Sequence, residues 1–268
     1  MTRIAQLFER LRREGRPGLI AYLTAGDPNP ETTALLVAGL ERGGADLIEL
    51  GVPFSDPIAD GPVIQRGSER ALKAGTNLSR VLQIAAEIRQ SSDIPLLLFT
   101  YMNPVMRYGI DKLARDACAA GIDGCLLTDL SVEEAEKYID TMREHGLDTV
   151  FLAAPTSTER RLKLVAKYSS GFVYLVSRTG VTGEQTSVST AVNPLIERMR
   201  RVTDLPLAVG FGIAKPEHAR EVGEVADAVV VGSAIVRMIE KYGGDPALAV
   251  NLEAFARELA GALPRRNA

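Results

Sequence analysis

The chain has 268 residues, carries a formal net charge of -3 and is 46% hydrophobic. This composition fits an α/β protein with a large core, and the small charge gives no electrostatic basis for binding nucleic acid or an anionic membrane. No apolar run is long enough to span a bilayer, and two cysteines fit neither a disulfide framework nor a zinc site, so we expect a cytoplasmic protein with reduced thiols.

Residues 1–14 have the pattern of a charged amphipathic helix and lack the apolar core of a signal peptide. From there, β-rich runs alternate with helical patterns. Strands are predicted at residues 19–23, 47–51, 95–100, 124–128, 150–154, 172–176, 207–210 and 228–232. Helices between them include residues 29–42, 78–90, 110–120, 132–144, 158–168 and 191–202. A further helix is predicted at residues 245–263, against the side of the sheet.

This alternation predicts right-handed βαβ units and a parallel sheet. Eight such units match the (β/α)₈ TIM barrel, here a single domain over residues 1–268 with extra N-terminal and C-terminal helices. An open doubly wound sheet would alternate too, but no Gly-x-Gly-x-x-Gly turn follows the first strand. Neither His145 nor His218 lies at a predicted strand end, so we expect no histidine triad and no metal site.

One predicted strand carries an ionisable residue where none is expected. Glu49 lies in the apolar run of residues 47–51, and a charge there is unfavourable unless it is paired or takes part in chemistry. The following proline-rich loop brings a second carboxylate, Asp60. Burial should raise the pKa of Glu49 toward the range that acid–base catalysis needs. The sequence therefore predicts an acid–base pair at this strand end.

Glycines follow the last two predicted strands. Gly210, Gly212 and Gly232 lie where many barrels hold a phosphate group with backbone N–H groups, and Ser233 is expected to cap the next helix. The loop after the sixth strand, residues 177–190, is long, small and polar, and we expect it to act as a lid. The bland alternatives are tight turns and a surface excursion.

Aromatic side chains fall near several strand ends. Tyr22, Tyr101, Tyr174 and Phe211 are expected to ring the mouth of the barrel and to form a flat apolar pocket. Together with the carboxylates and the phosphate-binding glycines, such a pocket suits a substrate with an aromatic head and a phosphorylated tail.

The motifs resemble the tryptophan synthase alpha subunit family. The resemblance covers residues 19–240 and rests on LIELGVPFSDPIADGP at 47–62, SRTGVTG at 177–183, GFGI at 210–213 and GSAIV at 232–236. It implies retro-aldol cleavage of indole-3-glycerol phosphate to indole and glyceraldehyde 3-phosphate, with Glu49 and Asp60 catalytic. The substrate-binding residues that it implies are Tyr22, Leu126, Tyr174, Thr182, Gly183, Phe211, Gly212, Gly232 and Ser233. Thr128 stands where a smaller alanine is expected.

The resemblance also implies a partner. A β subunit would bind this chain in an α₂β₂ assembly through Pro53, Asp56, Pro57 and Asn103, hold pyridoxal phosphate and receive the indole, while this chain would hold no cofactor. A stand-alone lyase with the same catalytic residues remains an alternative. A phosphosugar isomerase or epimerase, or a non-catalytic barrel, would not need the whole set of features.

Overall fold

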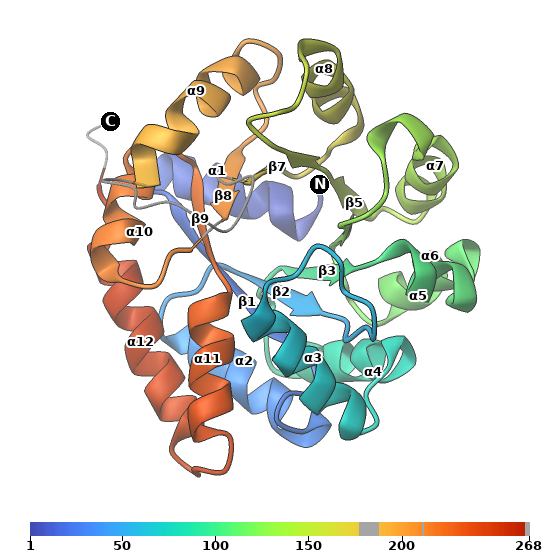
Figure 1. The fold of residues 1–268 in the computed structure, drawn as a ribbon, viewed down its shortest axis with the longest axis vertical. Coiled ribbons are helices and arrows are strands. Elements are labelled where there is room, and N and C mark those ends of the chain that lie inside the picture. The colour runs from blue at the N-terminus through green and yellow to red at the C-terminus, as the bar shows by residue number, and fades with distance from the viewer. Residues whose placement is uncertain (177–187, 211, 266–268) are drawn as a thin grey trace.

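The computed structural model describes residues 1–176, 188–210 and 212–265. Its strands form one parallel sheet that curves into a barrel, in the order β5-β4-β3-β2-β1-β9-β8-β7-β6 (Figure 1). The strands are β1 (Gly18–Thr24), β2 (Leu47–Gly51), β3 (Leu96–Thr100), β4 (Gly124–Leu127), β5 (Asp148–Val150), β6 (Leu152–Ala153), β7 (Val173–Val176), β8 (Leu207–Gly210) and β9 (Ala228–Val231). The predicted barrel is confirmed.

The ring closes through a single interrupted strand. β5 pairs with β4, whereas β6 pairs with β7, and only Phe151 separates the two segments in the chain. The carbonyl of Phe151 accepts a 3.1 Å hydrogen bond from the N–H of Tyr174. The one predicted strand at residues 150–154 therefore corresponds to two short segments, the first of which begins earlier than predicted, at Asp148.

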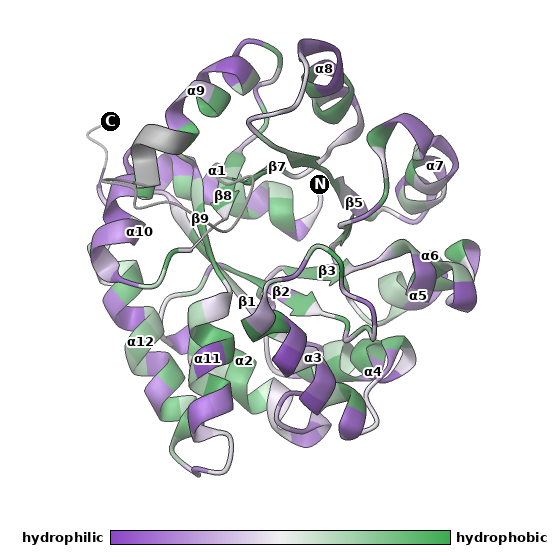
Figure 2. Ribbon diagram, in the orientation of Figure 1, coloured by the Kyte–Doolittle hydropathy of each residue, from purple (hydrophilic) through white to green (hydrophobic). Residues whose placement is uncertain are grey.

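Helices cover the strands, α1 at one end of the barrel and the others on its outside, with their hydrophilic residues facing away from the sheet (Figures 1 and 2). They are α1 (Arg3–Glu14), α2 (Thr33–Arg42), α3 (Pro62–Lys73), α4 (Leu78–Arg89), α5 (Met102–Tyr108), α6 (Ile110–Ala119), α7 (Glu136–Glu144), α8 (Glu159–Tyr168), α9 (Val188–Arg200), α10 (Pro216–Gly223), α11 (Ser233–Tyr242) and α12 (Leu248–Ala262). The helices predicted at residues 29–42 and 132–144 each begin with a separate 3₁₀ turn, Pro30–Thr32 and Val132–Glu134.

The two extra helices are confirmed, and they pack against different parts of the barrel. The apolar face of α1 packs into the barrel interior, where Phe8 contacts Phe172 with ring centroids 5.7 Å apart. Arg3 and Arg16 of this N-terminal segment pair with aspartates that precede strands. Helix α1 therefore covers the N-terminal end of the barrel, and the C-terminal strand ends remain for chemistry. Helix α12 packs against α2 on the outside.

Candidate active site

Glu49 lies near the C-terminal end of β2, in register with Tyr22 on β1. Its side chain is buried, with 1% of the residue exposed, and no described residue hydrogen-bonds either carboxylate oxygen. Burial alone raises the pKa of Glu49 to about 8. The group is therefore mostly protonated at neutral pH, and it can donate a proton to a ligand placed beside it.

Asp60 is held by the loop between β2 and α3. The N–H of the preceding Ala59 donates a 3.1 Å hydrogen bond to the hydroxyl oxygen of Tyr101, and the side chain of Gln65 donates a 2.9 Å bond to the carbonyl of Asp60. Burial raises the pKa of Asp60 to about 6, and a hydrogen bond with Tyr101 limits that rise. Asp60 is thus mostly ionised at pH 7, whereas Glu49 is mostly protonated. Two carboxyl groups whose pKa values differ in this way can act as the acid and the base of one reaction.

Two tyrosines, the buried Tyr22 and the half-buried Tyr174, lie close enough to both carboxyl groups for the charges of these groups to affect their pKa values. Burial raises the pKa of Tyr22, and the charges of Asp60 and Glu49 raise it further. Burial raises the pKa of Tyr174 too, with added repulsion from Glu49, Tyr22 and Asp60. The structure thus brings together the two predicted catalytic residues and two of the aromatic residues predicted to line the pocket.

The rest of the apolar lining comes from neighbouring strands. Leu126 on β4 belongs to the barrel-interior cluster, and Tyr174 packs against it. Phe99 on β3 contacts the ring of Tyr22 edge-on, with centroids 5.2 Å apart and planes at 76°. The sequence interpretation missed Phe99, although its position two residues after Leu97 places it on the inward face of the strand. Thr128 donates a 3.3 Å hydrogen bond to the carbonyl of Thr100.

Helix α11 begins beside the mouth of the barrel. Gly232 is its N-cap and Ser233 its first helical residue, so the expectation that Ser233 caps the helix is wrong by one position. Ser233 is exposed, and Gly212 adopts a left-handed φ of 62°. The residues that remain of the predicted set, Thr182, Gly183 and Phe211, lie outside the described residues, as does most of the predicted lid.

The predicted interface residues come from the loop after β2 and from α5, and they differ in exposure. Asp56 is exposed, and its carboxylate accepts a 2.5 Å hydrogen bond from Ser55. Pro57 is half-buried, Pro53 is buried, and Asn103 is exposed on α5. The loop and α5 are joined where the ring of Phe54 contacts Tyr101, with centroids 5.2 Å apart. Ile58, which sequence reasoning did not single out, is 84% exposed on the same loop.

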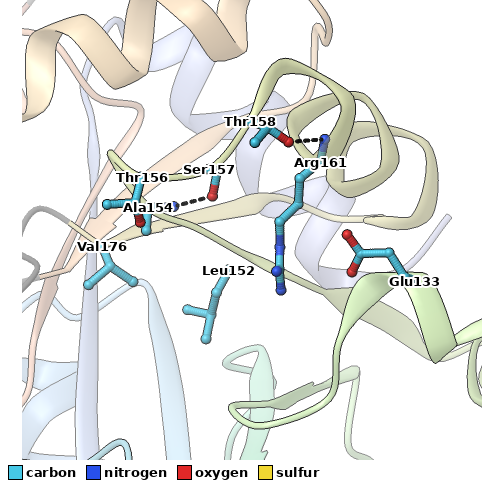
Figure 3. A pocket seen from close by; sticks show the side chains of 8 residues that line it. All are labelled: Glu133, Leu152, Ala154, Thr156, Ser157, Thr158, Arg161 and Val176. Atoms are coloured by element: carbon cyan, nitrogen blue, oxygen red, sulfur yellow. Dashed lines mark hydrogen bonds between the residues drawn. The ribbon is translucent and has the colours of Figure 1, made fainter.

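A separate cavity of about 570 Å³ opens at the ends of β6 and β7 (Figure 3). The side chain of Arg161 on α8 extends toward it, near Glu133. None of the residues predicted from the sequence lines this cavity; its described lining is Glu133, Leu152, Ala154, Thr156, Ser157, Thr158, Arg161 and Val176. The two carboxyl groups with raised pKa values, Glu49 and Asp60, are thus not part of this described lining.

Two further searches cover the described part of the chain. Within it, no three His, Cys, Asp or Glu side chains are grouped closely enough to hold a metal ion. No helix in the same residues is both long and apolar enough to cross a membrane.

Comparison with known proteins agrees with this geometry. The family model of the tryptophan synthase alpha chain matches residues 8–263. The tryptophan synthase alpha chain of Solibacter usitatus is 69% identical over 259 residues, which cover 97% of each chain, and that of Geotalea uraniireducens is 52% identical over 91% of this chain and 92% of its own.

Solved structures show the same likeness. The tryptophan synthase subunit alpha of Legionella pneumophila superposes with a TM-score of 0.90 at 36% identity and covers 98% of each chain. A chain of Mycobacterium tuberculosis tryptophan synthase gives a TM-score of 0.89 at 35% identity over the whole of both chains. The phosphosugar isomerase alternative does not fit these matches. The chain belongs to the tryptophan synthase alpha chain family, and it is a lyase that cleaves indole-3-glycerol phosphate.

Proposed function

We propose that Glu49 and Asp60 together catalyse the cleavage of indole-3-glycerol phosphate to indole and glyceraldehyde 3-phosphate. The observation that carries this assignment is Glu49 itself, a buried and mostly protonated carboxyl group without a described hydrogen-bond partner. A carboxyl group in such surroundings has an unfavourable free energy unless a ligand completes its contacts.

The order of proton transfers follows from the two pKa values. Protonated Glu49 donates its proton to C3 of the indole, and the ring nitrogen then carries positive character. Ionised Asp60 stabilises that charge. Glu49, now a carboxylate, removes the proton from the hydroxyl group next to the bond that breaks. The electrons of the carbon–carbon bond return to the ring, so indole and an aldehyde are released and Glu49 is protonated again.

An Asp60→Asn variant tests the second role. Because Asp60 stabilises a charge that develops during the reaction, the substitution should lower kcat much more than it raises KM. Steady-state rates with indole-3-glycerol phosphate give both constants. A variant that changes KM alone would assign Asp60 to substrate binding and not to catalysis.

The phosphate group is held, in this proposal, by backbone N–H groups at Gly212, Gly232 and Ser233, with Thr182 and Gly183 contacting the substrate from the lid. The support is the N-terminus of α11, a ten-residue helix whose dipole favours an anion there. A Gly232→Val substitution should obstruct the anion and raise KM sharply, whereas Ser233→Ala should raise it less. A crystal soaked with glycerol phosphate that shows the anion elsewhere on the barrel would contradict this placement.

The membership in the family implies a β-subunit partner. We propose that the partner docks on Pro53, Asp56, Pro57 and Asn103 to form an α₂β₂ assembly, holds pyridoxal phosphate and receives indole directly. Two features support this surface: the exposed carboxylate of Asp56 and the exposed Ile58, which lie on the loop that leads to Asp60. A partner that grips this loop would also position the catalytic carboxylate.

Size-exclusion chromatography of mixed subunits, and the cleavage rate with and without the β subunit, test this surface. Asp56→Ala should weaken both assembly and rate stimulation. If the variant keeps both, the partner docks elsewhere. If wild-type protein releases free indole at full rate and binds no β subunit, the chain is a stand-alone lyase.

A further inference from the structure

A network of four charged side chains joins α3 to α11 and to the turn that follows β1. Arg70 on α3 binds Asp27 in a bidentate manner, with both N–O distances 2.8 Å. Arg70 also donates a 3.2 Å hydrogen bond to Glu240 on α11. Arg66, one turn earlier, donates to the same Glu240 carboxylate at 2.5 and 3.0 Å. Arg70 therefore connects α3 to both other elements by charge-assisted hydrogen bonds.

The central pair of this network is partly shielded from water. Asp27 is fully buried, and the side chain of Arg70 is 28% exposed. The backbone approaches closely at the same place, because a Cβ on Gly67 would lie 2.9 Å from a methyl group of Val236 on α11 and 3.1 Å from the carboxylate of Asp27. A partly buried bidentate pair between closely packed elements holds a fixed geometry better than a fully exposed one.

The two helices that this network joins begin at opposite ends of the proposed substrate site. Helix α3 starts at Pro62, two residues after Asp60, and its Gln65 binds the carbonyl of Asp60. Helix α11 starts at Ser233, where the phosphate is proposed to bind. In the proposed complex, the carboxylate of Asp60 faces the indole ring and the N-terminus of α11 faces the phosphate. The packing of α3 against α11 thus sets the distance between these two groups.

We propose that Arg70 is a positioning residue that fixes this separation through Asp27 and Glu240. The inference rests on the proposed roles of Asp60 and of the α11 N-terminus. It predicts that a ligand that spans both ends depends on Arg70, whereas a ligand that occupies one end alone does not, because only the spanning ligand needs the two ends at one distance.

The test compares two inhibitors, indole-3-propanol phosphate, which spans the site, and glycerol phosphate, which occupies the phosphate end. In Arg70→Met, the inhibition constant of the spanning ligand should rise about tenfold or more, and that of glycerol phosphate should stay within about twofold. Arg70→Lys, which keeps the charge but loses the bidentate geometry, should lie in between. Glu240→Gln should weaken binding of the spanning ligand selectively too, but by a smaller factor, because the Asp27–Arg70 pair remains. This variant keeps the proposal testable if Arg70→Met does not fold.

Arg80 provides a matched control. Its side chain is 27% exposed and pairs with Glu31 and Glu87, away from the two helix starts. Arg80→Met should leave both inhibition constants within about twofold of wild type. Equal weakening of both ligands in the Arg70 and Glu240 variants, or no weakening of either, would overturn the proposal. The proposed chemistry is tested separately by the turnover of Glu49→Gln, since the two inhibition constants report binding and not the chemical step. The chemistry is contradicted if that variant keeps its turnover, whatever the inhibition constants show.

Discussion

The ring of Tyr22 occupies the space that a side chain at position 51 would need. A Cβ atom on Gly51 would lie 2.3 Å from the hydroxyl oxygen of Tyr22, closer than real Cβ atoms come to such a neighbour. Tyr22 pairs in register with Glu49, two residues before this glycine. Gly51 therefore allows a large aromatic ring to lie across β2, and the position of the Tyr22 ring depends on the absence of a side chain there.

Gly51→Ala should destabilise the protein and lower kcat/KM. The new methyl group must displace the Tyr22 ring, and overpacking of this kind typically costs about 1–3 kcal/mol. Urea unfolding and the steady-state cleavage rate measure the two effects. Gly261→Ala is the control, because position 261 is in α12, has open space around it and gains helix propensity. Equal stability of Gly51→Ala and wild type would show that the ring can move freely.

Because the two positions compete for one space, Gly51→Ala and Tyr22→Leu should be non-additive. The smaller leucine gives the new methyl group room, so we expect the double variant to be more stable than the sum of the single effects by about 0.5–3 kcal/mol. A double-mutant cycle by urea unfolding measures this coupling energy. Simple additivity would contradict the steric account.

The strands could be predicted from the sequence, and the two carboxyl groups proposed to be catalytic could be singled out, because both leave local signals. An acidic residue inside an apolar run, as at Glu49, is visible without any tertiary information. The position of Tyr101 was visible too, but its hydrogen bond with the N–H of Ala59 joins residues 42 positions apart and depends on how two strand ends meet. Phe99 against Tyr22, and the Asp27–Arg70 pair, depend on such packing as well, so periodicity alone could not supply them.

Glu49 should make folding stability depend on pH. Its pKa is about 8 in the folded protein and 4.5 ordinarily, so the folded state binds more protons than the unfolded state between these values. Stability from this group is fully present below pH 4.5, decreases as the pH rises and is lost above pH 8. At about 1.4 kcal/mol for each pH unit, the whole difference is on the order of 5 kcal/mol.

Urea unfolding of wild type and Glu49→Gln at pH 5 and pH 8.5 checks this expectation. The variant has no carboxyl group to ionise at this position, so it should gain stability relative to wild type as the pH rises. Asp60 titrates in both proteins, and the comparison between them isolates Glu49. A difference that does not change with pH would show that the pKa of Glu49 is not raised.

The pH dependence of kcat/KM should be bell-shaped. In the proposed mechanism, activity needs Asp60 ionised, with a pKa of about 6, and Glu49 protonated, with a pKa of about 8. The rate should therefore rise through pH 6 and fall through pH 8. In Asp60→Asn the residual activity should lose the acidic limb and keep the alkaline one. An alkaline limb whose midpoint is far from pH 8 would contradict the assignment of Glu49 as the proton donor.

Tyr101→Phe should move the acidic limb to higher pH. The hydrogen bond with Tyr101 lowers the pKa of Asp60, so its removal leaves burial as the dominant influence and raises that pKa. The N–H of Ala59 also loses its acceptor, which should loosen the loop. The pH profile of the variant, compared with that of wild type, measures the shift. Tyr108→Phe is a control, because Tyr108 binds the carboxylate of Asp116 on the outside of the barrel; an equal shift there would rule out a specific effect.

The turnover of Glu49→Gln with indole-3-glycerol phosphate tests the central claim most directly. Glutamine keeps the size of the side chain but can neither donate the proton to C3 nor accept the one from the hydroxyl group. We expect an unchanged circular dichroism spectrum and a loss in kcat of at least 10²-fold, the order that acid–base catalysis typically supplies. Near-wild-type turnover by the folded variant would contradict the assignment of Glu49 as the group that moves both protons.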